Sequence, residues 1–491
     1  MATLSPARIA AADVLSNVRR RNARARDLLR TSAPVARLTP ADRALATRLA
    51  LGGVRTSGTV DALLDAHLRR GHLEPRVRDA LRISAFELLW LATPAHVAIS
   101  QGVELVRRVS PHGTGLANAV LHRVAEEDLP ALARARERVE RRNCTASGIA
   151  LVAALPQWLA DELMVSLGTD GVCRMALSAL DAPGVYVAGN ACLHNDVEVE
   201  HLLSAAGLMP CSTSLPGCLS LSSAAGLAAS GLVDVVDVVP ADMAAQVVAW
   251  LASPAPGTRM LEVGQGRGTK SLLLESCALR RGGLAHLAAV ESEAFKVAVS
   301  RTRMERARLG KAVTCTALDG RRLGEKGLPP ELSGSFDSAF VDAPCSGTGT
   351  LRRHPEIAWA LQEPAIRTAG QSLPALQLEL LRAASTRVGA GGTLAYATCS
   401  ELRQENEGVV SAFLAGQEGA AFSLVSPRST AAFAALPPQA QRLVTAMIGP
   451  DGMVRTSRVD TPELPLDGHF LALLVREASI EHLFRNLAQG T

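Results

Sequence analysis

Short apolar segments alternate with amphipathic helical segments between residues 257 and 416. Apolar residues in the longer segments recur at spacings of three and four, as on one face of a helix. The expected strands are 258–264, 286–291, 313–316, 338–343 and 393–398, and the expected helices are 268–278, 293–309, 371–388 and 403–416. This alternation predicts a mostly parallel sheet with helices on both faces. Ligands bind such sheets beyond the carboxyl ends of the strands. We therefore expect an α/β domain over residues 241–480 with its functional residues in those loops.

The N-terminal part of the chain has a helical pattern throughout. Breaks containing proline or glycine at 38–40, 71–75 and 110–113 separate the amphipathic stretches. We predict an all-α domain of six or seven helices over residues 1–145. A small mixed α+β connecting subdomain is expected over residues 146–240, so the fold class is α + α/β.

Positive charge is concentrated at the N-terminal end. Residues 1–150 contain 24 Arg, no Lys, and 14 Asp plus Glu, which gives this part a net charge of +10. The whole chain has a formal net charge of +4, so the remainder carries about −6. Arginines cluster at 19–26 and at 134–142, a pattern that favours binding to nucleic-acid phosphates. The alternative is a solvated helix face in an arginine-rich protein.

Two observations bear on the compartment. No window contains eighteen consecutive apolar residues, and the first ten residues lack the apolar core of a signal peptide. The nine cysteines include no CxxC pair and no Cys/His cluster at zinc spacing, so we expect reduced thiols and no metal site. The sequence therefore predicts a cytoplasmic protein that does not enter a membrane.

A glycine-rich loop follows the first strand of the α/β domain. Its residues are Gly264, Gln265, Gly266, Arg267, Gly268, Thr269 and Lys270. Glycines allow a tight turn and a close approach of the backbone to a ligand. Glu291 ends the second strand, where a carboxylate can accept hydrogen bonds from ribose hydroxyls, and Asp319 follows the third strand, where it could contact an adenine amino group. A single acid of this kind could equally be a helix cap. Taken as a set, their order suits a nucleoside cofactor such as S-adenosylmethionine.

Two cysteines follow the fourth and fifth strands. Cys345 comes soon after Asp342, and Cys399 ends the run Tyr-Ala-Thr-Cys. A thiolate with a lowered pKa is a good nucleophile, and adding it to carbon 6 of a cytosine activates carbon 5 toward methylation. An acid must polarise the ring and a base must remove the proton from carbon 5. The alternative, a core cysteine on a hydrophobic strand, is the interpretation we adopt for Cys315.

These residues resemble a known family. Residues 342–347 (DAPCSG), 352–355 (RRHP), 396–400 (YATCS) and 405–407 (ENE) are similar to motifs IV and VI of the RNA 5-methylcytosine methyltransferases of the Nol1/Nop2/Sun family. The N-terminal part resembles the NusB-like RNA-binding domain of the bacterial Sun/RsmB-type branch, through residues 42–43, 52–55, 94–96 and 118–121. Residues 242–246 and 467–470 also resemble family segments, and the likeness covers essentially the whole chain.

The resemblance implies a role for each site residue. Cys399 would be the nucleophile, and Cys345 would assist release of the product. Lys270 and Asp342 would lie at the target cytosine, with Asp342 also near the cofactor. Three further residues fall at cofactor-contacting positions: Glu291, Lys296 and Asp319. The implied fold of the α/β domain is a Rossmann-like class I methyltransferase, and the implied substrate is a cytosine in small-subunit (16S) ribosomal RNA, naked or in an early small-subunit particle, bound by a monomer.

The glycine loop departs from the family pattern. The usual Cys-Ala-Ala-Pro-Gly-Gly-Lys-Thr is replaced by Gly-Gln-Gly-Arg-Gly-Thr-Lys-Ser over residues 264–271, which keeps Lys270 and adds Arg267. This change leaves open a non-catalytic RNA-binding ribosome assembly factor with a degenerate cofactor pocket. A cytosine-C5 methyltransferase of transfer RNA is a second alternative. A DNA methyltransferase is disfavoured, because DNA enzymes use a Pro-Cys nucleophile and lack the second cysteine.

Overall fold

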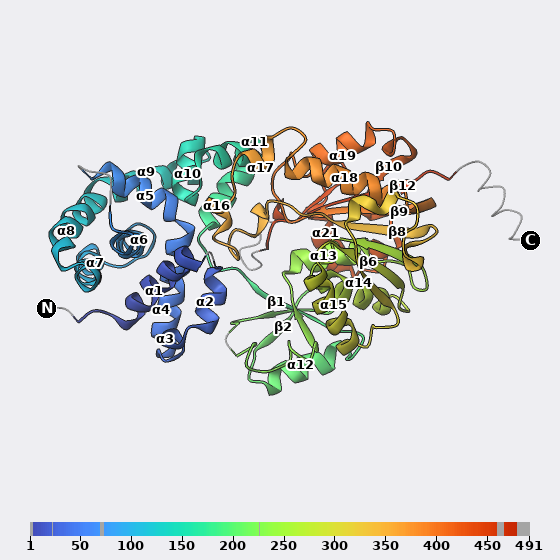
Figure 1. Ribbon diagram of the computed structural model, residues 1–491, viewed down its shortest axis with the longest axis horizontal. Coiled ribbons are helices and arrows are strands. Elements are labelled where there is room, and N and C mark those ends of the chain that lie inside the picture. Colours follow the sequence, from blue (N-terminus) through green and yellow to red (C-terminus); the bar gives the residue numbers. More distant parts are fainter. Residues whose placement is uncertain (1–2, 22, 69–72, 225, 459–465, 479–491) are drawn as a thin grey trace, which may run out of the picture. The chain divides into compact units, whose positions relative to one another are not determined.

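The computed structural model describes all residues except 1–2, 22, 69–72, 225, 459–465 and 479–491. The chain forms two compact units (Figure 1). The helical unit comprises Met1–Ala182 together with Leu351–Glu363, and the sheet unit comprises Pro183–Thr350 and Pro364–Thr491. The helical unit therefore extends beyond residue 145, because α10 and α11 pack with α9.

The helical unit is built from α-helices. They are α1 (Pro6–Arg21), α2 (Ala25–Thr31), α3 (Ala33–Ala36), α4 (Pro40–Arg55), α5 (Ser57–Ala66), α6 (Pro75–Trp90), α7 (Ala95–Val109), α8 (Thr114–Arg123), α9 (Leu129–Glu140), α10 (Ala146–Ala153), α11 (Gln157–Ser178) and α16 (Ile357–Ala360). Nine of them fall within the described part of residues 1–145, where the sequence predicted six or seven. The extra elements are short helices such as the four-residue α3, which have no amphipathic repeat to detect.

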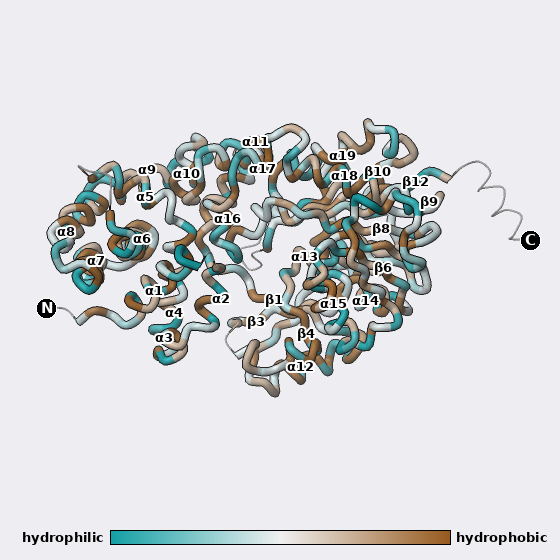
Figure 2. Tube along the Cα trace, viewed as in Figure 1, coloured by the Kyte–Doolittle hydropathy of each residue, from teal (hydrophilic) through white to brown (hydrophobic). Residues whose placement is uncertain are grey.

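The core of this unit is formed by small and aliphatic residues where helices cross. Helix α4 starts at Thr39, whose hydroxyl accepts a hydrogen bond from the Asp42 amide, with Pro40 at the first helical position. Gly52 of α4 lies so close to the Phe86 ring of α6 that an added Cβ would be 2.0 Å from a ring carbon. Hydrophobic and hydrophilic residues alternate along the helices, as Figure 2 shows for α6, α7 and α8. The buried stripe of each helix thus faces its neighbours.

Residues Leu351–Glu363 come from the middle of the sheet unit's sequence but pack into the helical unit. The Trp359 indole N–H donates to the Arg55 carbonyl at 2.8 Å. The same ring fills the space beside Gly58, where a Cβ would be 2.2 Å from a ring carbon. Arg26 Nε donates to the Arg353 carbonyl at 2.6 Å. The helical unit is therefore incomplete without this segment.

The main sheet of the second unit has the strand order β10-β12-β9-β8-β5-β6-β7, with β11 paired to β12. Strands β5 to β9 are parallel to one another, and β12 runs antiparallel to β9, β10 and β11. The strands are β5 (Arg259–Val263), β6 (His286–Glu291), β7 (Val313–Ala317), β8 (Phe336–Asp342), β9 (Val388–Thr398), β10 (Phe422–Val425), β11 (Val454–Arg455) and β12 (Phe470–Arg476). The chain order reverses between β5 and β8, which is where such sheets bind ligands.

Helices cover both faces of this sheet. Met260 of β5 and Phe340 of β8 point into one core with residues of the first set of helices, whereas their neighbours Leu261 and Val341 point into the opposite core with residues of the second set. The first set is α13 (Met243–Ala252), α14 (Thr269–Arg280), α15 (Ala294–Arg306), α20 (Ala431–Ala434) and α21 (Pro438–Met447), and the second is α18 (Leu373–Ser385) and α19 (Glu407–Leu414). Helix α17 (Pro364–Arg367) precedes α18. The architecture is a Rossmann-like three-layer fold (Figure 1).

A smaller antiparallel sheet precedes the main one in sequence, with the order β2-β3-β1-β4. Its elements are β1 (Val185–Gly189), α12 (Asp196–Ala205), β2 (Pro210–Ser212), β3 (Cys218–Leu221) and β4 (Val238–Pro240). Asn195 and Glu198 form a capping box that starts α12. This sheet and α12 have the mixed α+β character that the sequence predicted for the region. No single described helix is long and apolar enough to span a membrane, and α10 with α11, bent by 110°, reaches that length only as a pair.

Candidate active site

The carboxyl ends of β5, β8 and β9 bring the predicted site residues together. In the sheet register Val263 lies opposite Val341, and Asp342 lies opposite Ala397, two residues before Cys399. Gly264 has a φ of +84°, and a Cβ there would be 2.3 Å from the Asp342 carbonyl oxygen. Only glycine fits this left-handed turn against the neighbouring strand. The glycine loop is therefore anchored beside the end of β8.

Lys270 and Asp342 form a half-buried ion pair. Lys270 lies in the first turn of α14, and its Nζ is 2.5 Å from Asp342 Oδ2. Burial of the ammonium opposes its charge, but the Asp342 carboxylate outweighs this effect and raises the pKa of Lys270. Lys270 is therefore protonated at neutral pH and keeps a positive charge next to the two cysteines.

The two cysteines of the predicted site are in contact. Cys345 Sγ and Cys399 Sγ are 3.2 Å apart, and the Cys399 amide donates to Cys345 Sγ at 3.3 Å. A hydrogen bond from the Cys345 thiol, reinforced by the charge of Lys270, lowers the pKa of Cys399. The same hydrogen bond, together with burial, raises the pKa of Cys345 well above its ordinary value. The geometry therefore favours a thiolate at Cys399 and a thiol at Cys345.

A buried carboxylate joins the two cysteine loops. Glu405 is fully buried, and its oxygens accept hydrogen bonds from the Ser346 amide at 2.8 Å and from the Ser346 and Ser400 hydroxyls at 2.5 Å each. The Gln377 amide donates to Glu405 at 2.9 Å and to the Pro344 carbonyl at 2.9 Å. Ser346 and Ser400 follow the two cysteines directly in sequence. Glu405 thus fixes the spacing of both loops.

Glu405 belongs to a motif that resembles the family, but the sequence indicates no role for it. No sequence pattern singles out Gln377. A carboxylate six residues after a cysteine carries no sign that it is buried. Its function follows only from the hydrogen bonds that it accepts from both loops. Cys315 is a buried core residue, as predicted.

A second buried acid lies beneath the ion pair. Glu262, in β5, is fully buried and accepts a hydrogen bond from the Ser271 hydroxyl at 2.6 Å. Burial raises the pKa of Glu262 to about 8, and the nearby Asp342 carboxylate acts in the same direction. This side chain is therefore largely protonated at neutral pH and adds little negative charge beneath the site.

The predicted cofactor residues lie along the ends of β5, β6 and β7. The Gly266 amide donates to Glu291 Oε2 at 2.9 Å, and the Glu293 amide donates to Glu291 Oε1 at 3.0 Å. Lys296 Nζ is 2.6 Å from Glu293 and 4.0 Å from Glu291. Within the described part of the chain, no atom would lie within 4 Å of a Cβ at Gly266, so the loop borders open space there. Glu291 thus holds the backbone of the glycine loop at a point where the loop borders open space.

Other predicted cofactor residues form hydrogen bonds with residues of the same chain. The Gln265 amide donates to Ser271 and Cys315, so it points into the sheet unit's interior. The Arg321 guanidinium bonds both oxygens of Asp319 and lowers the pKa of that carboxyl. Arg303 donates to the Arg267 carbonyl at 2.7 Å and to the Thr269 hydroxyl at 3.0 Å. The contacts of Gln265 and Arg303 hold the atypical glycine loop against the rest of the sheet unit, whereas the Asp319–Arg321 contact lies after β7.

Comparison with known proteins identifies the family. The 16S rRNA methyltransferase RsmB/F family matches residues 249–453, and the NusB family matches residues 5–126. A ribosomal RNA small subunit methyltransferase B from Thermus thermophilus is 30% identical over 76% of this chain and 79% of its own length. The Pseudomonas putida protein of the same name is 32% identical, over 77% and 82%. This chain belongs to the RsmB/F family of rRNA methyltransferases.

The fold agrees with this assignment. The crystal structure of PH0851 superposes with a TM-score of 0.69 at 20% identity, covering 96% of this chain and 99% of the other. The helical unit contains the NusB domain, and the sheet unit contains the Rossmann-like methyltransferase domain. As a methyltransferase of this family, the protein uses S-adenosylmethionine as methyl donor.

Proposed function

We propose that this RsmB/F-family protein methylates carbon 5 of a cytosine in small-subunit (16S) ribosomal RNA through a covalent Cys399–cytosine intermediate. The observation that carries the proposal is the contact between the two sulfurs, 3.2 Å apart, beside the Lys270–Asp342 pair. A thiolate, a thiol that can later act as a base, and a cation–carboxylate pair are the groups that this chemistry requires.

The first half of the reaction forms a carbon–sulfur bond. The Cys399 thiolate adds to carbon 6 of the cytosine, and the electrons of the carbon 5–carbon 6 double bond move onto carbon 5. Negative charge also builds on the ring. The Lys270–Asp342 pair is placed to hold the base. The Lys270 ammonium, kept in place by the Asp342 carboxylate, can stabilise that charge by donating a hydrogen bond to ring nitrogen 3. S-adenosylmethionine, when bound, supplies the methyl group that carbon 5 receives.

The second half releases the product. A base removes the proton from carbon 5, the double bond re-forms, and the carbon 6–sulfur bond breaks to return the thiolate to Cys399. We assign the proton to Cys345. Once the Cys399 sulfur is bonded to carbon, it no longer carries the negative charge that keeps Cys345 protonated, so Cys345 becomes able to ionise and accept the proton.

The residues that would hold the cofactor follow from the open space beside the glycine loop. Gly264, Gly266 and Gly268 allow the backbone to approach it. Glu291 already accepts from the Gly266 and Glu293 amides, and a carboxylate has further lone pairs that can accept hydrogen bonds from ribose hydroxyls. Lys296, Asp319 and Asp342 lie at the remaining positions expected to contact it, whereas Gln265 and Thr269 support the loop from behind.

Two features support ribosomal RNA as the substrate. The curated relatives are named as small-subunit ribosomal RNA methyltransferases, and the arginine-rich N-terminal part provides charge for phosphate binding. A cytosine must leave the base stack to reach Cys399, so the target should lie in a loop or in locally open RNA.

The test is methyl transfer from labelled S-adenosylmethionine to 16S ribosomal RNA, with transfer RNA in parallel, followed by analysis of the nucleosides. Labelled 5-methylcytidine in 16S RNA is the expected product. If labelled 5-methylcytidine appears only in transfer RNA, the substrate is transfer RNA and not 16S RNA. A different labelled nucleoside would refute the cytosine chemistry. RNA binding without any methyl transfer would indicate a non-catalytic assembly factor.

A further inference from the structure

A hollow in the helical unit is lined by arginines from three helices. Its volume is about 570 Å³, and α1, α2, α3, α6 and α7 contribute to its walls. Arg20 and Arg21 come from the end of α1, Arg76 from the start of α6, and Arg108 from the end of α7. These side chains are exposed, and nearly ninety residues of sequence separate the first from the last. The fold thus collects four cations around one cavity.

These four arginines differ from the other charged residues nearby. Among the residues whose positions are described, no ion pair or hydrogen bond is formed by the Arg20, Arg21, Arg76 or Arg108 side chain. Two carboxylates also line the hollow: Asp13, which is exposed, and Asp79, which is buried. The four cations therefore outnumber the acids of the lining.

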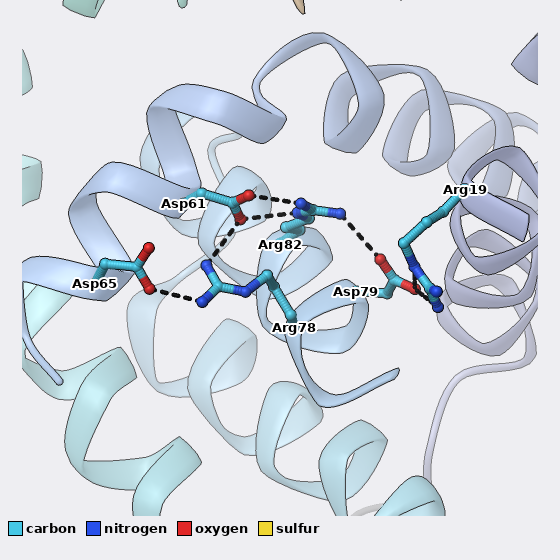
Figure 3. Close-up of polar contacts among 6 residues, drawn as sticks. All are labelled: Arg19, Asp61, Asp65, Arg78, Asp79 and Arg82. Carbon is cyan, nitrogen blue, oxygen red and sulfur yellow. Dashed lines mark hydrogen bonds and ion pairs between the residues drawn. The ribbon is translucent and has the colours of Figure 1, made fainter. Parts of the chain in front are cut away.

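The buried acid is already neutralised. Asp79 accepts from Arg19 at 3.0 Å and from Arg82 at 3.0 Å (Figure 3). Arg82 also pairs with Asp61, and the network continues through Arg78 (Figure 3). Figure 3 shows this run of alternating charges connecting α1, α5 and α6. Because Asp79 has two guanidinium partners, it does not balance the arginines that face the hollow.

The second arginine-rich cluster is different. On α9, Arg136 pairs with Glu140 at 3.3 Å, and Arg141 pairs with Glu137 at 2.6 Å. These are helix pairs four residues apart. Arg142 pairs with Asp170 at 3.4 Å, and Arg134 and Arg138, like the rest of this cluster, do not line the hollow. The two clusters look alike in sequence, at residues 19–26 and 134–142. Among the described arginines of the two clusters, Arg20 and Arg21 line this hollow, whereas none of residues 134–142 does.

We infer that this hollow, and not α9, is where the helical unit binds the phosphates of the substrate RNA. Guanidinium groups bind phosphate oxygens with charge-assisted, often bidentate hydrogen bonds. The volume is in the range that accommodates a nucleotide-sized group. Leu28, Pro34 and Leu105 add apolar wall against which a ribose or an unstacked base can pack. The inference rests on the proposed RNA substrate and names the surface that contacts it.

The experiment compares two double variants of the full-length protein with equal loss of charge. Arg76→Gln/Arg108→Gln removes two cations of the hollow, whereas Arg136→Gln/Arg141→Gln removes two from α9. The affinity for a 16S RNA fragment is measured against salt concentration. We expect the first variant to bind about tenfold more weakly at moderate salt. A plot of its log affinity against log salt concentration should become less steep. The magnitude of the negative slope should decrease by about 1.4, or roughly 0.7 for each lost contact to single-stranded RNA. The α9 variant should keep the wild-type slope.

If the hollow variant binds RNA with the affinity and salt dependence of the wild type, the inference is overturned. The ligand to test next would then be an acidic protein surface. Equal losses in both variants would also overturn it, because net charge alone would then explain binding. Arg20→Gln/Arg21→Gln provides a second variant if the first fails to fold, as judged by circular dichroism. Methyl transfer from S-adenosylmethionine to the same RNA is measured with the wild-type protein in parallel. Failure of the proposed reaction, seen as no methylation by the wild type, is therefore distinguishable from failure of this inference.

Discussion

At the scale of single residues, the Lys270–Asp342 pair determines the charge of the site. Asp342→Asn should reduce methyl transfer by at least a hundredfold with little loss of stability, because the amide keeps the size of the side chain but provides neither charge nor a proton. The measurement is single-turnover methylation of RNA together with thermal unfolding. An Asp342→Asn variant with near-normal turnover would show that this carboxylate is only structural.

The raised pKa of Glu262 predicts how the stability of the protein depends on pH. Its pKa in the folded protein, about 8, lies above the ordinary value of 4.5, so the folded protein holds this proton more tightly than the unfolded chain does. Stability from this group is therefore full below about pH 4.5 and is lost as the pH rises toward 8. Glu262→Gln should flatten the fall in Tm between pH 6 and pH 8.5 and be more stable than the wild type at pH 8.5, by a few kcal/mol. An unchanged pH dependence would contradict the burial argument.

The sequence pointed to the reactive side chains that the structure brings together, but not to the residues that position them. Asp342, Cys345 and Cys399 lie at or just after strand ends, and Lys270 follows a glycine-rich loop, and such local patterns can be read directly. Glu405 depends on hydrogen bonds to two loops that are 54 residues apart in the sequence. No local pattern contains that information.

At the scale of structural elements, the clamp formed by Glu405 holds the loops after β8 and β9 together. Glu405→Gln removes the charge that the Ser346 and Ser400 hydroxyls and the Ser346 amide share. We expect a loss of about 1–3 kcal/mol in stability. Methyl transfer should fall about tenfold or more, with the pH profile of Cys399 reactivity shifted, while cofactor affinity is retained.

Glu407→Gln is the matched control for the clamp. Glu407 lies two residues further on and pairs with Arg455, away from both cysteine loops. The Glu407→Gln variant should be less stable than the wild type, but the pH profile of its Cys399 reactivity should not shift. If Glu405→Gln and Glu407→Gln behave alike in that profile, Glu405 has no role in positioning the cysteines.

The predicted strands of the sheet agree with the structure because each is a short apolar run that ends at a polar or glycine-containing loop. The predicted strand 286–291 coincides with β6 (His286–Glu291), and 338–343 overlaps β8 (Phe336–Asp342). Strands β10 and β12 were not assigned. Their antiparallel pairing joins segments about fifty residues apart, which the alternation of strands and helices does not encode.

At the scale of the whole molecule, Leu351–Glu363 belongs to the helical unit although its neighbours in sequence belong to the other. Trp359→Ala should destabilise the helical unit by about 2 kcal/mol, because it removes ring packing against Gly58 and a hydrogen bond to the Arg55 carbonyl. Denaturant unfolding measures this change. Trp359→Phe, which keeps the ring but not the N–H, should lose about half as much, and an unchanged midpoint in both variants would contradict the packing.

The end of the helical unit could not be read from composition. The basic run near residue 142 resembles a linker, yet α10 and α11 continue the helical unit to Ala182. Deleting residues 1–145 would also remove the partners of Trp359. Charge substitutions in the intact chain are therefore the cleaner way to separate RNA affinity from chemistry.

The most direct test of the proposed mechanism compares Cys399→Ala with Cys345→Ala, each incubated with substrate RNA and S-adenosylmethionine and then examined by denaturing gel electrophoresis. Cys399→Ala removes the thiolate that attacks carbon 6, so it should be inactive and form no adduct. Cys345→Ala leaves attack and methyl transfer possible but removes the group that takes the proton from carbon 5, so a protein–RNA adduct should accumulate. An adduct with Cys399→Ala and none with Cys345→Ala would reverse the two roles and contradict this account.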